Sequence, residues 1–215
     1  MKQQKQLWLS AAVLAAVLAI GTLTFTWYFK QAVPQNLVPA PTGITGRVLE
    51  NLSDQSKKQL VDFLKAEPTI IGVSVVQASL VKNRRLTVFF KSDNPDFQAV
   101  WDEYLLNRAP SPPLFSPEEP AQNNRVANLF NGNFLCARFE DTISMKFWPK
   151  GAEYAPWTCT VPVPPGFDAT GDFNGFINLY MTDEPSETEK RRLAKVAAEI
   201  SQDIYRRDVE SAPVK

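Results

Sequence analysis

The chain has 215 residues, and its 23 basic and 23 acidic side chains give a formal net charge of zero. It contains no histidine, which excludes Ser-His and Cys-His nucleophile pairs and removes the commonest metal ligand. We therefore expect a protein that is not an enzyme, with no catalytic residues, no metal site and no cofactor. The basic residues are not expected to form a basic face, so nucleic-acid binding is not expected either.

The segment Leu7–Phe29 is typical of a membrane-spanning helix. Its 23 residues carry no charge, and at about 1.5 Å per residue such a helix spans a hydrocarbon core roughly 30 Å thick. Trp8 and Trp27 lie near its two ends, where membrane interfaces favour aromatic side chains. We predict a single-pass anchor in contact with membrane lipid, preceded by a cytoplasmic stub of residues 1–6. A cleaved signal peptide is the alternative, although its apolar region is usually shorter.

The lysines around this segment predict its orientation. Lys2 and Lys5 precede it, whereas Lys30 is the single basic residue that follows it before Arg47. Cytoplasmic flanks carry the excess of positive charge, so the N-terminus is expected inside and the rest of the chain outside. We expect a protein of the bacterial inner (cytoplasmic) membrane whose domain lies in the periplasm or outside the cell.

Small residues recur on one face of the predicted span. Ala11, Ala15 and Ala19 follow one another at intervals of four residues. This spacing allows two membrane helices to approach closely, so a homodimer through this face is one interpretation. The other is that alanine is simply common in membrane helices.

The rest of the chain divides into three parts. Residues 30–46 contain three prolines and predict a stiff linker between membrane and domain. A single domain is expected over residues 47–207, which are enough to bury a core. Residues 208–215 are expected to form a frayed tail.

The first part of the domain predicts a helix followed by a hairpin. Ser53 is a suitable N-cap, and Pro68 bars continuation of the helix. The β-rich runs Thr69–Ser79 and Leu86–Phe90 are separated by a polar turn, which favours two antiparallel strands.

A second helix is predicted to begin at Asp93 or Asn94, with Pro95 at its first position. Residues 109–121 contain five prolines and are not expected to be regular. They form either a solvated crossover or a lid over a site. A short helix is expected over residues 123–131.

The C-terminal part predicts four strands and a closing helix. The strands, separated by Gly, Pro and Asp, are Phe134–Phe139, Thr142–Trp148, Trp157–Val163 and Phe173–Met181. Ser186 and Glu189 have the form of a capping box at the start of the helix. The apolar residues that follow recur at helical spacing and form one stripe: Leu193, Val196, Ala197, Ile200 and Ile204.

These elements predict an α+β fold, with the N-terminal transmembrane helix followed by one central antiparallel sheet flanked by helices. Four C-terminal motifs resemble the closing half of a GAF domain: Val161–Val163, Gly171, Gly175–Tyr180 and Pro185–Glu189. The first hairpin is also similar to that of GAF, PAS and Cache sensor domains. The resemblance implies a GAF/PAS-like sensor fold over residues 47–207. The sequence lacks the signature of cyclic-nucleotide-binding members and a cysteine placed for a bilin.

Cys136 and Cys159 are the two cysteines of the chain. In an oxidising compartment such a pair is typical of a disulfide, which would here join two predicted strands. Two buried free thiols are the alternative. Because no CxxC sequence is present, a redox centre is not expected.

Aromatic residues crowd the region of the predicted middle strands. Small-molecule pockets combine aromatic walls with a few polar anchors. If this region binds a ligand, we expect Arg138 to anchor it and Trp148, Tyr154 and Trp157 to form walls. The alternative is an aromatic core without a pocket.

The function that fits these features best is a membrane-anchored binding or interaction module outside the cytoplasm. It would sense a small molecule and relay the signal to a membrane or envelope protein partner. The alternative is a structural or inhibitory subunit of an envelope complex, with no ligand pocket. A cavity in the domain favours the first interpretation, and a solid core favours the second.

Overall fold

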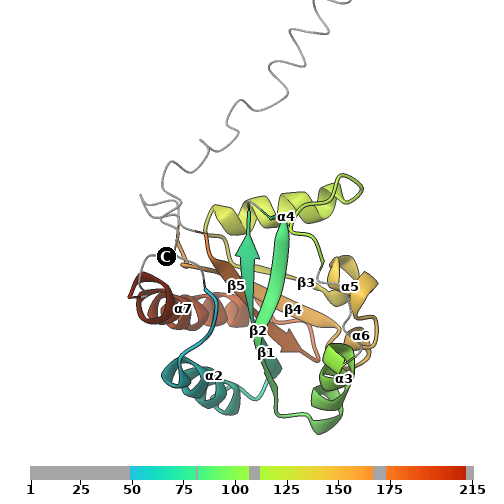
Figure 1. The fold of residues 1–215 in the computed structure, drawn as a ribbon. Helices are drawn as coiled ribbons and strands as arrows, with labels where there is room; N and C mark the ends of the chain where they lie inside the picture. Colours follow the sequence, from blue (N-terminus) through green and yellow to red (C-terminus); the bar gives the residue numbers. More distant parts are fainter. Residues whose placement is uncertain (1–48, 81, 107–111, 167–172, 212–215) are drawn as a thin grey trace, which may run out of the picture. The chain divides into compact units, whose positions relative to one another are not determined.

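The computed structural model describes residues 49–80, 82–106, 112–166 and 173–211 (Figure 1). The predicted stub, membrane span, alanine face and linker all lie in residues 1–48, outside the described part of the chain. Among the helices that the structure describes, none is long and apolar enough to cross a membrane.

The domain is built on one sheet of five strands in the order β2-β1-β5-β4-β3. All neighbouring strands are antiparallel. The strands are β1 (Ile70–Ser79), β2 (Arg84–Ser92), β3 (Leu135–Arg138), β4 (Trp157–Val163) and β5 (Gly175–Met181). The predicted hairpin is confirmed as β1 and β2, and the predicted antiparallel sheet flanked by helices is present.

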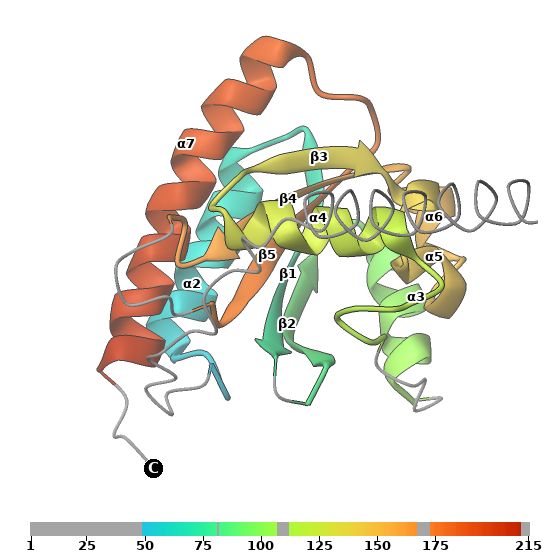
Figure 2. The ribbon, with the colours of Figure 1, turned by 90° about the horizontal axis from the view of Figure 1, so that it is seen from above.

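Helices cover both faces of this sheet. They are α2 (Asp54–Ala66), α3 (Pro95–Leu106), α4 (Pro120–Phe130), α5 (Ser144–Phe147), α6 (Gly151–Tyr154) and α7 (Glu187–Ile204). Figures 1 and 2 show α2 and α7 together on one side of the sheet, with α3, α5 and α6 on the other. Helix α4 packs on the same face as α3 through a cluster that joins Val126 and Leu129 to Val76 and Phe176 of the sheet.

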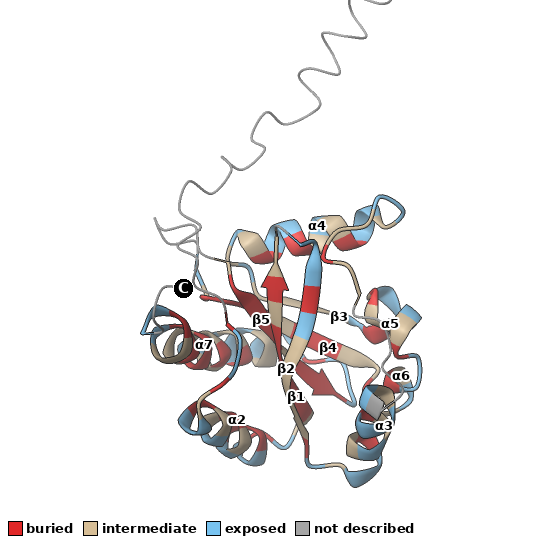
Figure 3. Ribbon diagram, viewed as in Figure 1, coloured by how far each residue is buried: buried red, intermediate tan, exposed pale blue. Residues whose placement is uncertain are grey.

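Helix α7 forms where the sequence predicts it. Its capping box is present, because Ser186 Oγ accepts a hydrogen bond from the backbone of Glu189, whose carboxylate accepts one from the backbone of Ser186. The apolar stripe turns inward, and the outer face stays exposed (Figure 3). Four of its members are buried: Leu193, Ala197, Ile200 and Ile204. Each large apolar side chain buried in this way stabilises the fold by about 1.5–3 kcal/mol.

The other predicted caps are also present. Ser53 Oγ accepts a hydrogen bond from the backbone of Ser56 at the start of α2. Asn94 Oδ1 accepts from the backbone of Asp96 and Phe97 at the start of α3. These contacts satisfy N–H groups that have no partner within a helix.

The predicted strand Thr142–Trp148 is wrong. This stretch follows a 3-10 turn at Phe139–Asp141 and contains α5, so the segment is helical. The alternation of apolar residues resembles a strand, but Phe139, Ile143 and Trp148 are the ones that are buried. Phe139 and Trp148 pack in the same aromatic cluster, and the turn and short helix between them bring both side chains to it.

The chain also stays helical beyond the expected end of the domain. A π-helical stretch, Tyr205–Glu210, continues α7. Val209 is fully buried, and Asp208 Oδ1 accepts a hydrogen bond from the backbone of Ser53 at 3.2 Å. The start of the expected tail is therefore packed against the beginning of α2.

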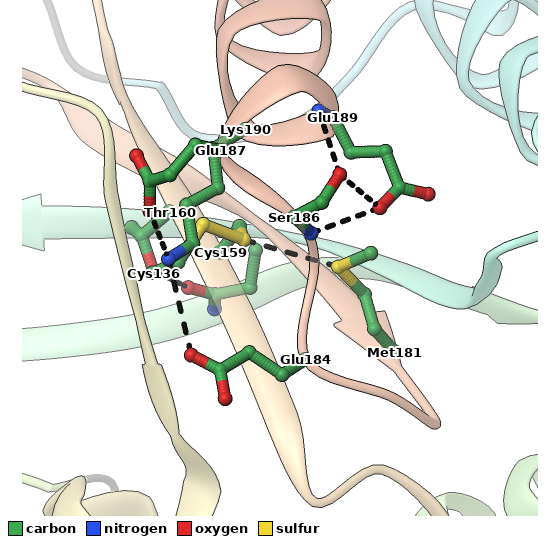
Figure 4. Close-up of a disulfide and its surroundings, with 10 residues drawn as sticks. Cys136, Cys159, Thr160, Met181, Glu184, Ser186, Glu187, Glu189 and Lys190 are labelled. Atoms are coloured by element: carbon green, nitrogen blue, oxygen red, sulfur yellow. Dashed lines mark hydrogen bonds and ion pairs between the residues drawn. A yellow bond between two sulfur atoms is a disulfide. The ribbon is translucent and has the colours of Figure 1, made fainter.

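The predicted disulfide joins Cys136 of β3 to Cys159 of β4. The two residues are direct partners across the antiparallel pair, with their Cα atoms 4.0 Å apart. Figure 4 shows the bond together with Met181, whose Sδ lies 3.8 Å from the Cys159 sulfur. The disulfide ties the edge strand β3 to the buried strand β4.

Candidate ligand-binding site

The two faces of the sheet differ in polarity. The strand residues that face α2 and α7 are apolar: Val73, Val75, Cys159, Val161, Ile177 and Leu179. Alternate residues of the same strands point the other way, and several of these are polar: Ser74, Thr158, Thr160, Asn178 and Tyr180. Because a buried polar group is costly unless it is hydrogen-bonded, polar residues at these interior positions distinguish this face from an ordinary core.

Four of these polar residues form a continuous hydrogen-bond network across three strands. Thr160 Oγ1 donates to Asn178 Oδ1 at 3.0 Å. Asn178 Nδ2 donates to Ser74 Oγ at 3.1 Å, and Ser74 Oγ lies 3.1 Å from the hydroxyl of Tyr180. Burial raises the pKa of Tyr180 to about 12, so its hydroxyl stays neutral at physiological pH. The network provides a fixed, uncharged polar floor.

Two adjoining cavities lie over this floor. The larger has a volume of about 140 Å³ and is bounded by β2, α3, α5 and the sheet. The smaller, of about 40 Å³, lies between α4 and the sheet. Five residues line both cavities: Arg85, Ser144, Phe176, Asn178 and Tyr180.

Arg85 is the charged residue at the junction of the two cavities. It is only 9% exposed. Its Nε and Nη2 donate to the carbonyl oxygen of Pro113 at 3.2 and 2.9 Å, which fixes the plane of the guanidinium. Burial lowers the pKa of Arg85 to about 10, and the group therefore still carries its charge at neutral pH. Within the described residues, no carboxylate forms an ion pair with it.

Arg125 of α4 lines the smaller cavity. Burial lowers its pKa, and the neighbouring charge of Asp141 acts in the opposite direction. In the part of the chain that the structure describes, neither Arg125 nor Arg85 forms a salt bridge, and no Asp or Glu lines either cavity. Two positively charged side chains thus line the smaller cavity, and its described lining contains no acidic side chain.

Aromatic side chains form the outer walls of the larger cavity. Trp101 and Trp148 both line it and lie edge to face with ring centroids 5.1 Å apart. The indole Nε1 of Trp148 is buried without a hydrogen-bond partner among the described residues. A buried N–H group normally has such a partner, so Trp148 is unusual among the aromatic residues of this wall.

The arrangement offers hydrogen-bond donors and apolar walls but no metal ligands. Across the described residues, no group of three His, Cys, Asp or Glu side chains is placed to hold a metal ion. Chemically, the described residues of the site can bind and orient a small molecule.

The structure separates the residues that the sequence analysis grouped as a ligand site. Trp148 lines the larger cavity. Arg138 points to solvent, where it pairs with Glu140 at 2.8 Å and is 58% exposed. Tyr154 packs behind the cavity with its ring centroid 6.0 Å from that of Phe97, and Trp157 packs in the core on the opposite face of the sheet. Ligand binding by these residues stays a prediction, and only Trp148 of the four lines a cavity.

Sequence reasoning missed Arg85, Arg125 and Asn178. Arg85 falls in the stretch expected to be a turn, whereas β2 begins one residue before it. A usable pattern was present in the strands, because Thr158, Thr160 and Asn178 are polar residues at alternate positions of otherwise apolar runs.

Comparison with known proteins gives relatives of similar fold only. No family model and no curated protein matches the chain. Among solved structures it is similar to the GAF domain/HD domain protein from Geobacter sulfurreducens, at 14% identity over 70% of this chain and 91% of that one, with a TM-score of 0.45. It is also similar to the GAF domain of a two-component sensor histidine kinase from Bacillus halodurans, at 8% identity over 71% and 93%, with a TM-score of 0.46.

A third solved structure is the photoproduct state of a GAF domain from Synechocystis, at 14% identity over 71% of this chain and 90% of that one, with a TM-score of 0.43. All three of these structures are GAF domains. These similarities concern the fold and not the ligand of this chain.

Proposed function

We propose that the domain binds a small molecule in the cavities beside Arg85 and acts as a GAF-like sensor without catalysis of its own. The observation that carries this proposal is the buried network of Thr160, Asn178, Ser74 and Tyr180 on the cavity side of the sheet. The four groups satisfy one another's hydrogen bonds, which offsets the cost of their burial, and two of them, Asn178 and Tyr180, line both cavities.

Two tryptophans in the cavity wall provide the test. The full-length chain is screened against a library of small metabolites, with intrinsic fluorescence and thermal unfolding as readouts, because Trp101 and Trp148 line the larger cavity. A specific ligand raises the unfolding temperature and changes the fluorescence. Ser144→Phe, which fills the junction of the two cavities, should abolish both effects.

A matched control places the same ring elsewhere. Glu153→Phe adds a phenyl group on the exposed surface of α6 and should bind the ligand as the parent does. If Ser144→Phe still bound the ligand, the binding site would have to lie in another part of the molecule.

A structural or inhibitory role in an envelope complex is the second candidate. It is favoured by the size of the larger cavity, about 140 Å³, which is below the roughly 300–1,000 Å³ of pockets for drug-sized ligands. A library without a single specific ligand would support this role.

We also propose that the chain is anchored in the bacterial inner membrane through Leu7–Phe29, with the domain outside the cytoplasm. The uncharged length of this segment supports the anchor. The disulfide between Cys136 and Cys159 fits an oxidising compartment. The domain would pass its signal to a membrane or envelope protein partner, or to a second copy through Ala11, Ala15 and Ala19. Protease accessibility of the domain in intact spheroplasts tests its side of the membrane.

A further inference from the structure

We infer that the ligand of this site is a small aromatic carboxylate, with its ring in the larger cavity and its carboxylate held by Arg85 and Arg125. This inference rests on the proposed function, because it names the chemical class of the molecule that the cavities accept.

Two arginines give the site a positive charge. Arg85 lies at the junction of the cavities and is 9% exposed, and Arg125 lines the smaller one. A buried charge without a partner is unfavourable. Within the described residues no acidic side chain lines either cavity, and the single carboxylate that acts on Arg125 is that of Asp141. An anionic ligand supplies the missing charge.

The hydrogen-bonding groups point to the same chemistry. Of the five N–H groups of a guanidinium, two of those on Arg85 donate to Pro113. The others have no hydrogen-bond partner among the described residues, and the Nε1–H of Trp148 has none either. The acceptor oxygen of Asn178 already receives a hydrogen bond from Thr160. The unused N–H groups of Arg85 can only donate, and they match the acceptor-only carboxylate.

The shape of the site sets the size of the ligand. One water-sized group needs at least about 10–15 Å³. The larger cavity, at about 140 Å³, then holds on the order of ten such groups, and its walls are aromatic at Trp101, Trp148 and Phe176. The smaller cavity has about 40 Å³, so the smaller of the two common anionic groups, a carboxylate, suits it better than a phosphate group.

The test uses three ligands that share a phenyl ring. Phenylacetate carries the carboxylate, phenylacetamide replaces it with a neutral group of the same shape, and phenyl phosphate replaces it with a larger anion. Each is titrated into the full-length protein and followed by tryptophan fluorescence and calorimetry. We expect phenylacetate to bind at least about 10-fold more tightly than phenylacetamide, since hydrogen bonds to charged groups are the stronger ones.

Two arginine variants locate the anion. Arg85→Gln and Arg125→Gln should each weaken phenylacetate binding by about 10- to 100-fold while leaving phenylacetamide binding within about threefold. Arg138→Gln is the matched control, because Arg138 is an exposed arginine on β3, at the opposite edge of the sheet from β2, and lines neither cavity. Thermal unfolding of each variant shows that it is folded, and Arg125→Gln leaves the Pro113 contact of Arg85 intact.

The outcomes separate this inference from the proposed function. Equal binding of phenylacetate and phenylacetamide, unaffected by either arginine variant, would overturn the carboxylate while a ligand site remains. Tighter binding of phenyl phosphate would overturn the carboxylate in favour of a phosphate. Absence of saturable binding by all three compounds would overturn the aromatic carboxylate, and the library screen with Ser144→Phe would then decide independently whether the cavities bind any ligand.

Discussion

The guanidinium of Arg85 donates two hydrogen bonds to the carbonyl oxygen of Pro113, at 3.2 and 2.9 Å. This contact links the edge strand β2 to the segment that covers it, where Arg84 and Pro113 also form a β-bridge. It holds a positive charge in one orientation beside the cavities. The part of the proline-rich stretch that the structure describes thus helps to build the site.

The charge of Arg85 predicts how binding depends on pH. Its pKa is lowered to about 10 by burial, and the phenols that face it stay neutral because burial raises the pKa of Tyr104 and raises that of Tyr180 to about 12. Phenylacetate affinity should therefore be constant between about pH 6 and 9 and fall only as the pH approaches about 10. Calorimetric titrations across this range measure it.

The lowered pKa of Arg85 also predicts how the stability of the fold changes with pH. A base whose pKa is lower in the folded state opposes folding while it is charged, so its unfavourable contribution decreases as the pH rises from about 10 toward 12.5. For binding, the opposite direction holds, because deprotonation removes the partner of the anion. A fall in affinity already between pH 7 and 8 would point to a different titrating group.

Removing the polar network should abolish ligand binding without lowering the stability of the fold. In Thr160→Val/Asn178→Leu, both partners of one hydrogen bond become apolar, and Ser74 keeps Tyr180 as its partner. Replacing both partners together is close to neutral or stabilising, so the free energy of unfolding in urea should change by less than about 1 kcal/mol or rise.

Ligand binding by this double variant should be lost, because the floor of the cavity would have no polar group at its centre. The single variant Asn178→Ala is the control for stability. It removes the acceptor of the Thr160 hydroxyl and should lower the free energy of unfolding by about 1–3 kcal/mol. A double variant that binds as well as the parent would show that the network has only a structural role.

The disulfide predicts a loss of stability on reduction. The bond between Cys136 and Cys159 closes a loop with a sequence separation of 23. In the chain-entropy model such a loop contributes about 3 kcal/mol. Cys136→Ala/Cys159→Ala should therefore unfold in urea at a correspondingly lower concentration, and a reducing agent should shift the parent to the same midpoint while leaving the variant unchanged. Equal midpoints for oxidised parent and variant would contradict this role.

Substitution of Gly175 should strongly destabilise the fold. It opens β5 with a φ of +155°, and a Cβ atom there would lie 1.9 Å from the carbonyl oxygen of Val76. Because that neighbour is backbone of the central strand, the contact cannot be relieved by a side-chain rotation. Gly175→Ala should lower the free energy of unfolding by about 3 kcal/mol or more. Gly166→Ala, with no atom within 4 Å, should be nearly neutral.

Elements with strong local patterns could be predicted from the sequence. Helix α7 has a capping box and a long apolar stripe, and β4 is bounded by the same residues, Trp157–Val163, in prediction and structure. The stretch Thr142–Trp148 could not be predicted, because its alternation fits a strand and only packing against the aromatic cluster makes it helical. The local sequence pattern alone does not distinguish a strand from a helix in this segment.

The site was less predictable than the fold for the same reason. Arg85 comes from β2, Arg125 from α4 and Asn178 from β5, and only the pairing of distant strands brings them together. The many aromatic residues near Arg138 in the sequence led to the prediction that Arg138 anchors a ligand, but this arginine is exposed. Tertiary structure instead places a different arginine, 53 positions earlier in the printed sequence, beside Trp148.

Native mass spectrometry of the full-length chain, isolated from its source without reducing agent, tests the proposal that this domain binds a small molecule most directly. We predict a mass about 2 Da below that of the reduced chain, from the disulfide, together with a non-covalent adduct on the order of 150 Da, which is the size that the larger cavity admits. The adduct should be absent from Ser144→Phe and present in Glu153→Phe. A parent chain that carries no adduct, and that gains none from any compound of the library, would contradict a ligand-binding role and favour a structural one.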